Sequence, residues 1–333
     1  MAALRHKISK KLEDKVSDNI TSMSDEELFS FQEYNANESE KTAYSHYSYW
    51  RSTLESFKKN KIAVFLVCIV VGILLFTFIQ PFLPNQYDPN MVNNDPKTGL
   101  QYRNIAPCSK FWFGTNSIGQ DLWSRIWTGT KNSLLIGITV ACIEALIGII
   151  AGVLWGYVRQ LDWFFTEVYN ILDNIPQTIV LILISYILKP GVTTLIFAMC
   201  LTSWIQMARF IRNQVLIIRD REYNLASRCV GTPTRRIIFK NLLPYLVSVI
   251  MLRMALSVPA AIGNEVFITY IGLGLPSDIP SLGRLINEGR ELMMSASLRY
   301  QLIFPTVVVS IVTISFYIIG NAFSDAADPK NHI

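Results

Sequence analysis

The sequence predicts an all-α integral membrane protein with six transmembrane helices and a polar N-terminal extension. Half of the 333 residues are apolar and the mean hydropathy is positive, a composition too apolar for a soluble domain of this size. Six apolar runs reach the length of about 20 residues that a helix needs to cross roughly 30 Å of hydrocarbon. The charged residues gather at the N-terminus and in one basic segment, residues 219–244.

Residues 1–60 are expected to form a cytoplasmic N-terminal extension, because they are polar and lack the apolar core of a signal peptide. Ser24 and Glu27 have the spacing of a capping box, which predicts a short helix. The aromatic residues between 44 and 50 and the lysines near residue 60 suit an amphipathic segment on the inner membrane face. A partly disordered cytosolic tail explains this composition equally well, so both interpretations stay open.

The six predicted spans lie within a second domain, residues 61–330. Their approximate bounds are 62–83, 133–157, 168–188, 193–211, 245–269 and 301–323. Basic residues set the orientation: four precede the first span, and eight lie between residues 209 and 240. The positive-inside rule places both groups in the cytoplasm, which an even number of spans allows. We therefore expect both termini inside, and extracellular loops at residues 84–132 and 270–300.

The second predicted span carries a ladder of small residues and one charge. Gly148, Gly152 and Gly156 recur at every fourth position, which predicts close packing against a neighbouring helix; a pore-lining role is the alternative. Glu144 lies one turn earlier, and Arg253 lies in the fifth span. A charge near mid-membrane costs about 2.5–3.5 kcal/mol, so each should face a cavity or a partner. We hypothesise that the two pair, in either a structural or a transport role.

The basic segment reads as two short helices joined by a glycine turn. Asp220 is expected to cap the first helix, with Glu222 in its first turn. Gly231 can adopt the left-handed conformation that ends this helix. Thr232 is then expected to cap a second helix with Pro233 at its first position. Such a rigid pair of helices would suit docking by another protein. The alternative interpretation is an ordinary basic loop.

Three stretches resemble the ABC-importer permeases of the oligopeptide and dipeptide (peptide/nickel) family, specifically the C-type subunit. The spacing from Ala226 through Gly231 to Pro244 resembles that family's cytoplasmic "EAA" loop, although Leu225 replaces its Glu. Residues 113–134, FGTNSIGQDLWSRIWTGTKNSL, resemble the segment before the family's second span. The third stretch comprises Glu265, residues 270–283 and the C-terminal run 320–329, which resemble its late signatures.

The resemblance implies an ABC type I importer fold with cytoplasmic coupling helices. The chain would be a permease subunit that forms, with a homologous second permease in the lipid bilayer, the path for oligopeptides from an extracytoplasmic binding protein. Two ABC ATPase subunits would bind ATP and Mg and act through residues 219–244. The residues implied are, for ATPase coupling, Glu222, Tyr223, Ala226, Ser227, Gly231, Thr232 and Pro233; for the pathway, Asn264, Glu265, Glu144 and Arg253; and for the outer gate or an interface, Asp121 and Arg125.

Several classes of function find no support in the sequence. It contains no Walker A loop, and its three histidines lie in polar termini, so we expect no enzymatic activity, no metal site and no cofactor in this chain. The net charge of +5 indicates membrane orientation rather than nucleic-acid binding. The five scattered cysteines are read as free thiols. The resemblance implies a multi-pass protein of the bacterial cytoplasmic membrane.

Two alternatives to an oligopeptide importer remain. A permease of the same family could carry another cargo, such as nickel, a dipeptide or a glutathione-like molecule. An ion-coupled carrier working alone would need an internal repeat or paired broken helices near the midplane, and the sequence shows neither.

Overall fold

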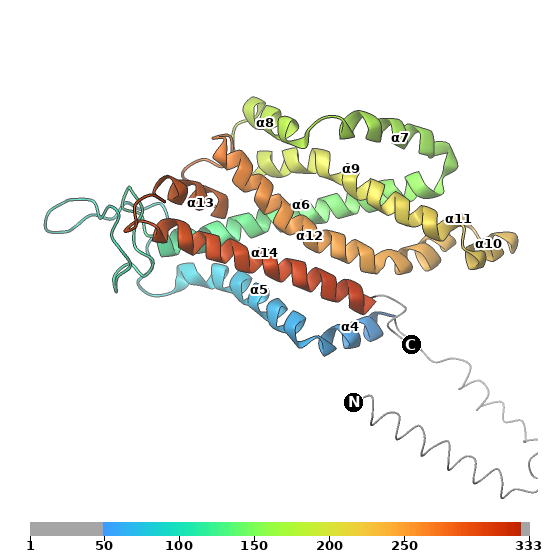
Figure 1. The fold of residues 1–333 in the computed structure, drawn as a ribbon, viewed down its shortest axis with the longest axis horizontal. Helices are drawn as coiled ribbons and strands as arrows, with labels where there is room; N and C mark the ends of the chain where they lie inside the picture. Colours follow the sequence, from blue (N-terminus) through green and yellow to red (C-terminus); the bar gives the residue numbers. More distant parts are fainter. Residues whose placement is uncertain (1–48, 328–333) are drawn as a thin grey trace, which may run out of the picture. The chain divides into compact units, whose positions relative to one another are not determined.

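The computed structural model describes residues 49–327, whose regular secondary structure is entirely helical (Figure 1). The chain divides into two compact units, residues 1–49 and 50–333, and nearly all of the first lies outside the described residues. The predicted capping box at Ser24 falls there too.

The helices follow one another with few long connections. Their bounds are α4 Tyr49–Lys59, α5 Lys61–Ile79, η1 Gln80–Phe82, α6 Leu122–Tyr157, α7 Arg159–Asp173, α8 Gln177–Ile187, α9 Val192–Arg219, α10 Glu222–Cys229, α11 Thr234–Ile237, the π-helical turn η2 Ile238–Leu242, α12 Leu243–Tyr270, α13 Leu282–Glu291 and α14 Tyr300–Ala327. Within the described range, five stretches are long and apolar enough to cross a membrane: α5 with η1, α6, α9, α11 through α12, and α14. They match five of the six predicted spans.

The remaining predicted span, 168–188, is not one straight helix. The chain bends by 76° between α7 and α8. The residue before a proline is disfavoured in a helix, and here Ile175 precedes Pro176, which is the N-cap of α8. The pair runs from the end of the bundle that bears α10 back towards the end that bears α13 (Figure 1). Counted as one broken span, it completes six crossings.

The second predicted span, residues 133–157, begins earlier than predicted, because α6 is one continuous helix of 36 residues that starts at Leu122. Asp121 caps its start by accepting a 2.9 Å hydrogen bond from the Ser124 N–H. Gly129 does not interrupt it. A Cβ at that position would lie only 3.0 Å from the Ser281 backbone, so the glycine admits the loop before α13. The outer segment and the span are therefore one rigid element.

The closest helix packing in the bundle joins α6 to α9, and it confirms the predicted glycine ladder. A Cβ on Gly148 would lie 2.5 Å from Met207, and one on Gly152 would lie 2.5 Å from the Ala208 carbonyl oxygen. At Gly156 the nearest atom, on Val215, would be 2.8 Å away. No side chain fits at these distances, so the two backbones approach closely over more than two turns. These helices make the most extensive pairwise contact among the described elements.

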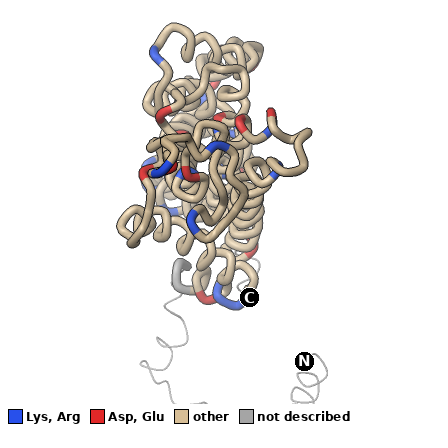
Figure 2. The backbone as a smooth tube through the Cα atoms, turned by 90° about the vertical axis from the view of Figure 1, so that its left-hand side faces the viewer, with Lys and Arg blue, Asp and Glu red and all other residues tan. Residues whose placement is uncertain are grey.

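The two ends of the bundle differ in charge. Figure 2 looks onto the end formed by α13 and the loop between η1 and α6, where basic and acidic residues are interspersed. Residues 270–300 hold three arginines and three acidic residues. At the opposite end, residues 219–244 hold six basic residues and two acidic ones. The apolar surfaces exposed between these ends, on α5 and α14 for example, suit contact with lipid tails.

We predict that Gly152→Val loosens α6 from α9 and lowers the free energy of unfolding by about 1–3 kcal/mol, the usual cost of overpacking. The measurement is thermal unfolding of the purified chain in detergent. Gly72→Val in α5 is the matched control, because a Cβ at Gly72 has nothing within 4 Å. Equal unfolding temperatures for both variants would contradict the role of the ladder.

Candidate functional site

The basic segment, residues 219–244, is the predicted coupling loop. It contains a short helix, after which the chain turns back sharply at Gly231. The Thr232 N–H donates to the Ser227 carbonyl at 3.0 Å and the Gly231 N–H donates to the Arg228 carbonyl at 2.9 Å, which is a Schellman motif. Gly231 has φ of +78°, the left-handed conformation predicted for it. The turn ends α10 and redirects the chain to Pro233.

The predicted caps of this loop are displaced. Asp220 ends α9 instead of starting α10, because its carboxylate pairs with Arg219 at 3.0 Å; Arg221 is the N-cap of α10. The second helix begins at Thr234, so Pro233 is its N-cap and Thr232 lies outside it. Neither helix has a side-chain cap.

Asn224 fixes α10 to the spanning helices, and the sequence analysis missed it. It is fully buried, and its amide donates to the carbonyl oxygen of Ile218, near the end of α9, at 2.9 Å. Its Oδ1 accepts a 3.0 Å hydrogen bond from Asn241 in the turn before α12. One side chain thereby ties α10 to both α9 and α12. The signal for Asn224 in the sequence is that a small amide residue lies between two larger residues, Tyr223 and Leu225, which are exposed.

Most of the predicted coupling residues are exposed, on α10 and on the turn that follows it. Glu222, Tyr223, Ala226, Gly231 and Pro233 are exposed. Ser227 and Thr232 are half-buried, and the Ser227 hydroxyl donates to the Tyr223 carbonyl. The neighbouring apolar residues Leu225 and Val230 are also exposed, Val230 at 85%. The helix α10 is therefore fixed to the bundle on its buried side, and its exposed side presents both apolar and polar residues.

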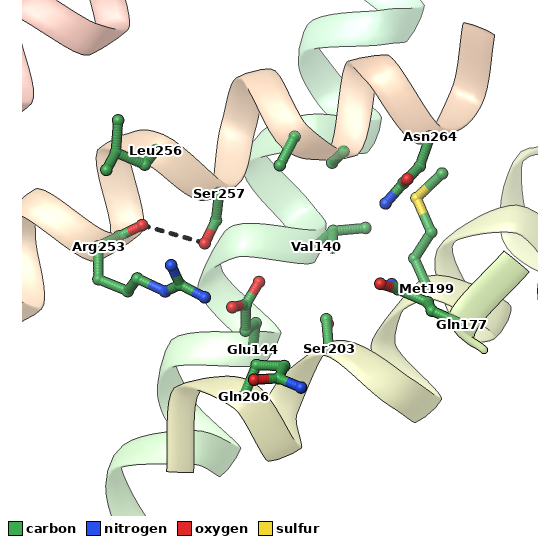
Figure 3. Close-up of a pocket in the computed structure, with 12 residues that line it drawn as sticks. Val140, Glu144, Gln177, Met199, Ser203, Gln206, Arg253, Leu256, Ser257 and Asn264 are labelled. Atoms are coloured by element: carbon green, nitrogen blue, oxygen red, sulfur yellow. Dashed lines mark hydrogen bonds between the residues drawn. The ribbon is translucent and has the colours of Figure 1, made fainter. Parts of the chain in front are cut away.

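A polar cavity of about 130 Å³ lies within the bundle, between α6, α8, α9 and α12 (Figure 3). It brings together three of the predicted pathway residues: Glu144 from α6, and Arg253 and Asn264 from α12. The sequence analysis missed the other polar residues that line it, which are Gln177, Ser203, Gln206 and Ser257. Ser203 and Gln206 stand three residues apart in an apolar helix, a polar spacing that could have identified them.

Glu144 and Arg253 face each other across this cavity, but they are not in contact. Their charged groups point towards one another in Figure 3, and no ion pair within 4.0 Å joins them in the described structure. The Arg253 Nε is buried without a hydrogen-bond partner among the described residues. Ser257 donates to the Arg253 carbonyl at 3.1 Å. The cavity thus holds two opposite charges with unused hydrogen-bonding capacity.

Glu265, the fourth predicted pathway residue, does not line the cavity. It is fully buried and accepts hydrogen bonds from Ser281 at 2.5 Å, Ser133 at 3.1 Å and Thr269 at 3.3 Å. Ser133 in turn accepts from the Leu282 N–H at 3.0 Å. Since Ser281 is the N-cap of α13 and Ser133 belongs to α6, this carboxylate fastens the start of α13 to α6 and α12.

Asp121 and Arg125 fasten the loop between η1 and α6 in the same region. Arg125 is 1% exposed, donates to Gln120 at 2.5 Å and to the Pro89 carbonyl at 3.4 Å, and lies 3.5 Å from Glu288 in α13. Asp121 is the buried N-cap of α6, and burial raises the pKa of its carboxyl while the Ser124 N–H opposes the rise. The structure therefore places both residues in contacts between the loop, α6 and α13.

We predict that Glu265→Leu detaches α13, because three hydroxyl groups lose their buried acceptor at about 1–3 kcal/mol for each unsatisfied group. Amide hydrogen exchange across residues 282–291 should quicken strongly, and less in Glu265→Gln, which keeps one acceptor oxygen. Glu291→Gln, an exposed change at the end of α13, is the control. Unaltered exchange in Glu265→Leu would show that this carboxylate does not hold α13.

Comparison with known proteins places this geometry in a family. Residues 145–332 match the model of the "binding-protein-dependent transport system inner membrane component", and residues 48–107 match the "N-terminal TM domain of oligopeptide transport permease C". The oligopeptide transport system permease protein AmiD of Streptococcus pneumoniae is 39% identical over 92% of this chain and 98% of its own length. The dipeptide transport system permease protein DppC of Bacillus subtilis is 36% identical, covering 85% of this chain and 86% of its own length.

A solved structure agrees on the fold. A chain of the MetNI methionine ABC transporter in an inward-facing conformation superposes with a TM-score of 0.50 at 20% sequence identity, covering 61% of this chain and 96% of that one. The family matches, the two relatives and the apolar helices lead to one conclusion: the chain belongs to the family of inner membrane permease components of binding-protein-dependent ABC transport systems.

Proposed function

We propose that this chain and a homologous second permease form the path through which an ATP-driven importer moves oligopeptides delivered by an extracytoplasmic binding protein. The observation that carries the proposal is α10, which lies at one end of the bundle (Figure 1) and is anchored through Asn224 to two spanning helices. Its exposed face suits docking to a soluble subunit. The sequence offers no phosphate-binding loop, so two partner ATPases would bind ATP and Mg.

A movement of the ATPases would be transmitted to the polar cavity through rigid helices. A displacement of α10 is passed by Asn224 to the end of α9 and, through Asn241, to the start of α12. The glycine ladder makes α6 follow α9. Because α6, α9 and α12 all line the polar cavity, their rigid-body rotation would open it to alternate sides.

The cavity has the chemistry to serve as a contact surface for peptide backbones. Asn264, Gln177 and Gln206 offer amide donors and acceptors, which match peptide groups regardless of side chain. Glu144 and Arg253 offer opposite charges for the termini of a peptide. At about 130 Å³ the cavity is smaller than ordinary ligand pockets of roughly 300–1,000 Å³, which fits a closed state. Glu265, Asp121 and Arg125 would act indirectly, by positioning α13 and the outer loop.

The basic charge at the α10 end supports an orientation with this end, and both chain termini, in the cytoplasm. The binding protein would then dock at the α13 end. A dipeptide cargo is the second candidate, because the Bacillus relative is named for dipeptide transport. The ligand that co-purifies with the binding protein distinguishes the two. An independent carrier is less well supported, since the described residues contain a single bent helix pair.

We predict that Gly231→Val weakens ATPase docking while the chain still inserts in the membrane. A Cβ at Gly231 meets nothing within 4 Å, so the substitution acts only by straining a left-handed backbone, by about 1–2 kcal/mol or more. Gly272→Val is the matched control, because its φ of +86° and its open surroundings are similar but it lies beyond the far end of α12. Co-purification of the ATPases at wild-type yield with Gly231→Val would refute the docking role.

We predict that proteoliposomes holding both permeases, the ATPases and the binding protein take up labelled oligopeptide only when ATP is present on the α10 side. The matched control replaces the ATPases with variants that bind but do not hydrolyse ATP. Uptake that persists without nucleotide would favour an ion-coupled carrier.

A further inference from the structure

A second cavity, unrelated to the polar cavity between the helices, lies behind the coupling loop. It measures about 350 Å³ and is lined by Arg159, Arg219 and Arg228 together with Tyr157, Thr232, Thr234 and Ile237. None of these arginines has a place in the proposed transport path. The concentration of guanidinium and hydroxyl groups in one cavity needs its own explanation.

The cavity lies at one end of the apolar spans, whichever side of the membrane the loop faces. Tyr157 and Arg219 are the last residues of two membrane-spanning helices, and Thr234 is the first residue of a third. The cavity therefore lies where three apolar spans end, on the side where the chain leaves the hydrocarbon. Close to Arg159 on α7, Trp163 and Phe164 are 74% and 52% exposed, as befits side chains at that boundary.

The charge in this cavity exceeds what the described residues neutralise. Asp220 pairs with Arg219 at 3.0 Å and lies 3.9 Å from Arg228. The hydrogen bond from Arg219 lowers the pKa of Asp220, and Arg228 and Arg159 lower it further, so Asp220 is ionised at neutral pH. Three arginines against one carboxylate leave two positive charges.

Donors also remain unused. Arg219 donates to the Gly156 carbonyl at 2.9 Å and Arg228 to the Arg219 carbonyl at 3.2 Å, so both partly serve to cap helix ends. The Nε of Arg228, however, is buried without a partner among the described residues. The side chain of Arg159 makes no hydrogen bond or ion pair within residues 49–327. Guanidinium groups with free donors bind phosphate oxygens in bidentate geometry.

We propose that this cavity binds the phosphate of an anionic phospholipid headgroup, with Arg159 and Arg228 as the principal donors and the Thr232 and Thr234 hydroxyls beside them. A lipid is favoured over other anions because the cavity lies where three apolar spans end, and because Trp163 and Phe164 are exposed near Arg159. Bound there, the lipid bridges the end of α6 to the coupling loop. Anionic lipid then stabilises the position of α10 relative to the bundle.

The test is native mass spectrometry of the full chain, alone and in its complex, after exchange into mixtures of phosphatidylglycerol and phosphatidylcholine. The wild-type chain should retain phosphatidylglycerol in preference. Arg159→Gln should reduce this retention about fivefold, the effect of one interfacial basic residue, and Arg228→Gln by a similar factor. Arg236→Gln is the matched control: it removes the same charge from the same loop, at an exposed position outside the cavity.

Three outcomes would overturn the proposal. Equal losses in Arg236→Gln and Arg159→Gln would mean general attraction to the basic loop. Displacement of the lipid by excess inorganic phosphate would assign the cavity to a free anion. Unchanged lipid retention in Arg159→Gln, with weaker co-purification of the ATPases, would assign it to an acidic side chain of a partner.

Discussion

The close approach of α6 and α9 along Gly148, Gly152 and Gly156 is the constraint on which the rest of the structure depends. In lipid no hydrophobic effect drives helices together, so association relies on contact between backbones, which only small residues permit. This pair carries the polar cavity on one side and, at its end, the anchor of α10. In the proposed mechanism, a displacement at α10 moves the helices that line the cavity.

The opposite end depends on buried polar contacts instead. Glu265 accepts hydrogen bonds from hydroxyl groups of α6, α12 and the start of α13, and Arg125 in α6 contacts both α13 and the loop between η1 and α6. Such groups are costly inside a protein unless each is satisfied, and here their partners come from segments far apart in the sequence. The bundle is thus held by close backbone contact between helices along its length and by buried polar contacts at the end that bears α13. A helix such as α13, which a few polar contacts hold in place, can detach when those contacts alone are lost.

The sequence predicted what depends on local composition and missed what depends on neighbours. Apolar length located the spans, and glycine spacing identified the α6 face. The break at Pro176 was not predicted, but its signal is present in the sequence, because a proline restricts the conformation of the residue before it. The continuity of α6 through Gly129 could not be predicted, because that glycine accommodates the loop at Ser281, which is distant in the sequence. The same holds for Asn224 and Glu265, whose partners only the fold brings near.

The central claim is that the α10 end faces the compartment that holds ATP, and two native cysteines test it directly. Cys229 ends α10 and Cys108 lies in the loop at the opposite end; both are exposed. In variants that retain one of the two, with the other four cysteines replaced by Ser, a membrane-impermeant maleimide added to intact cells should label Cys108 and spare Cys229. Permeabilised cells should show labelling of both. Labelling of Cys229 but not Cys108 in intact cells would contradict the orientation, and with it the proposal that ATPases act through this loop.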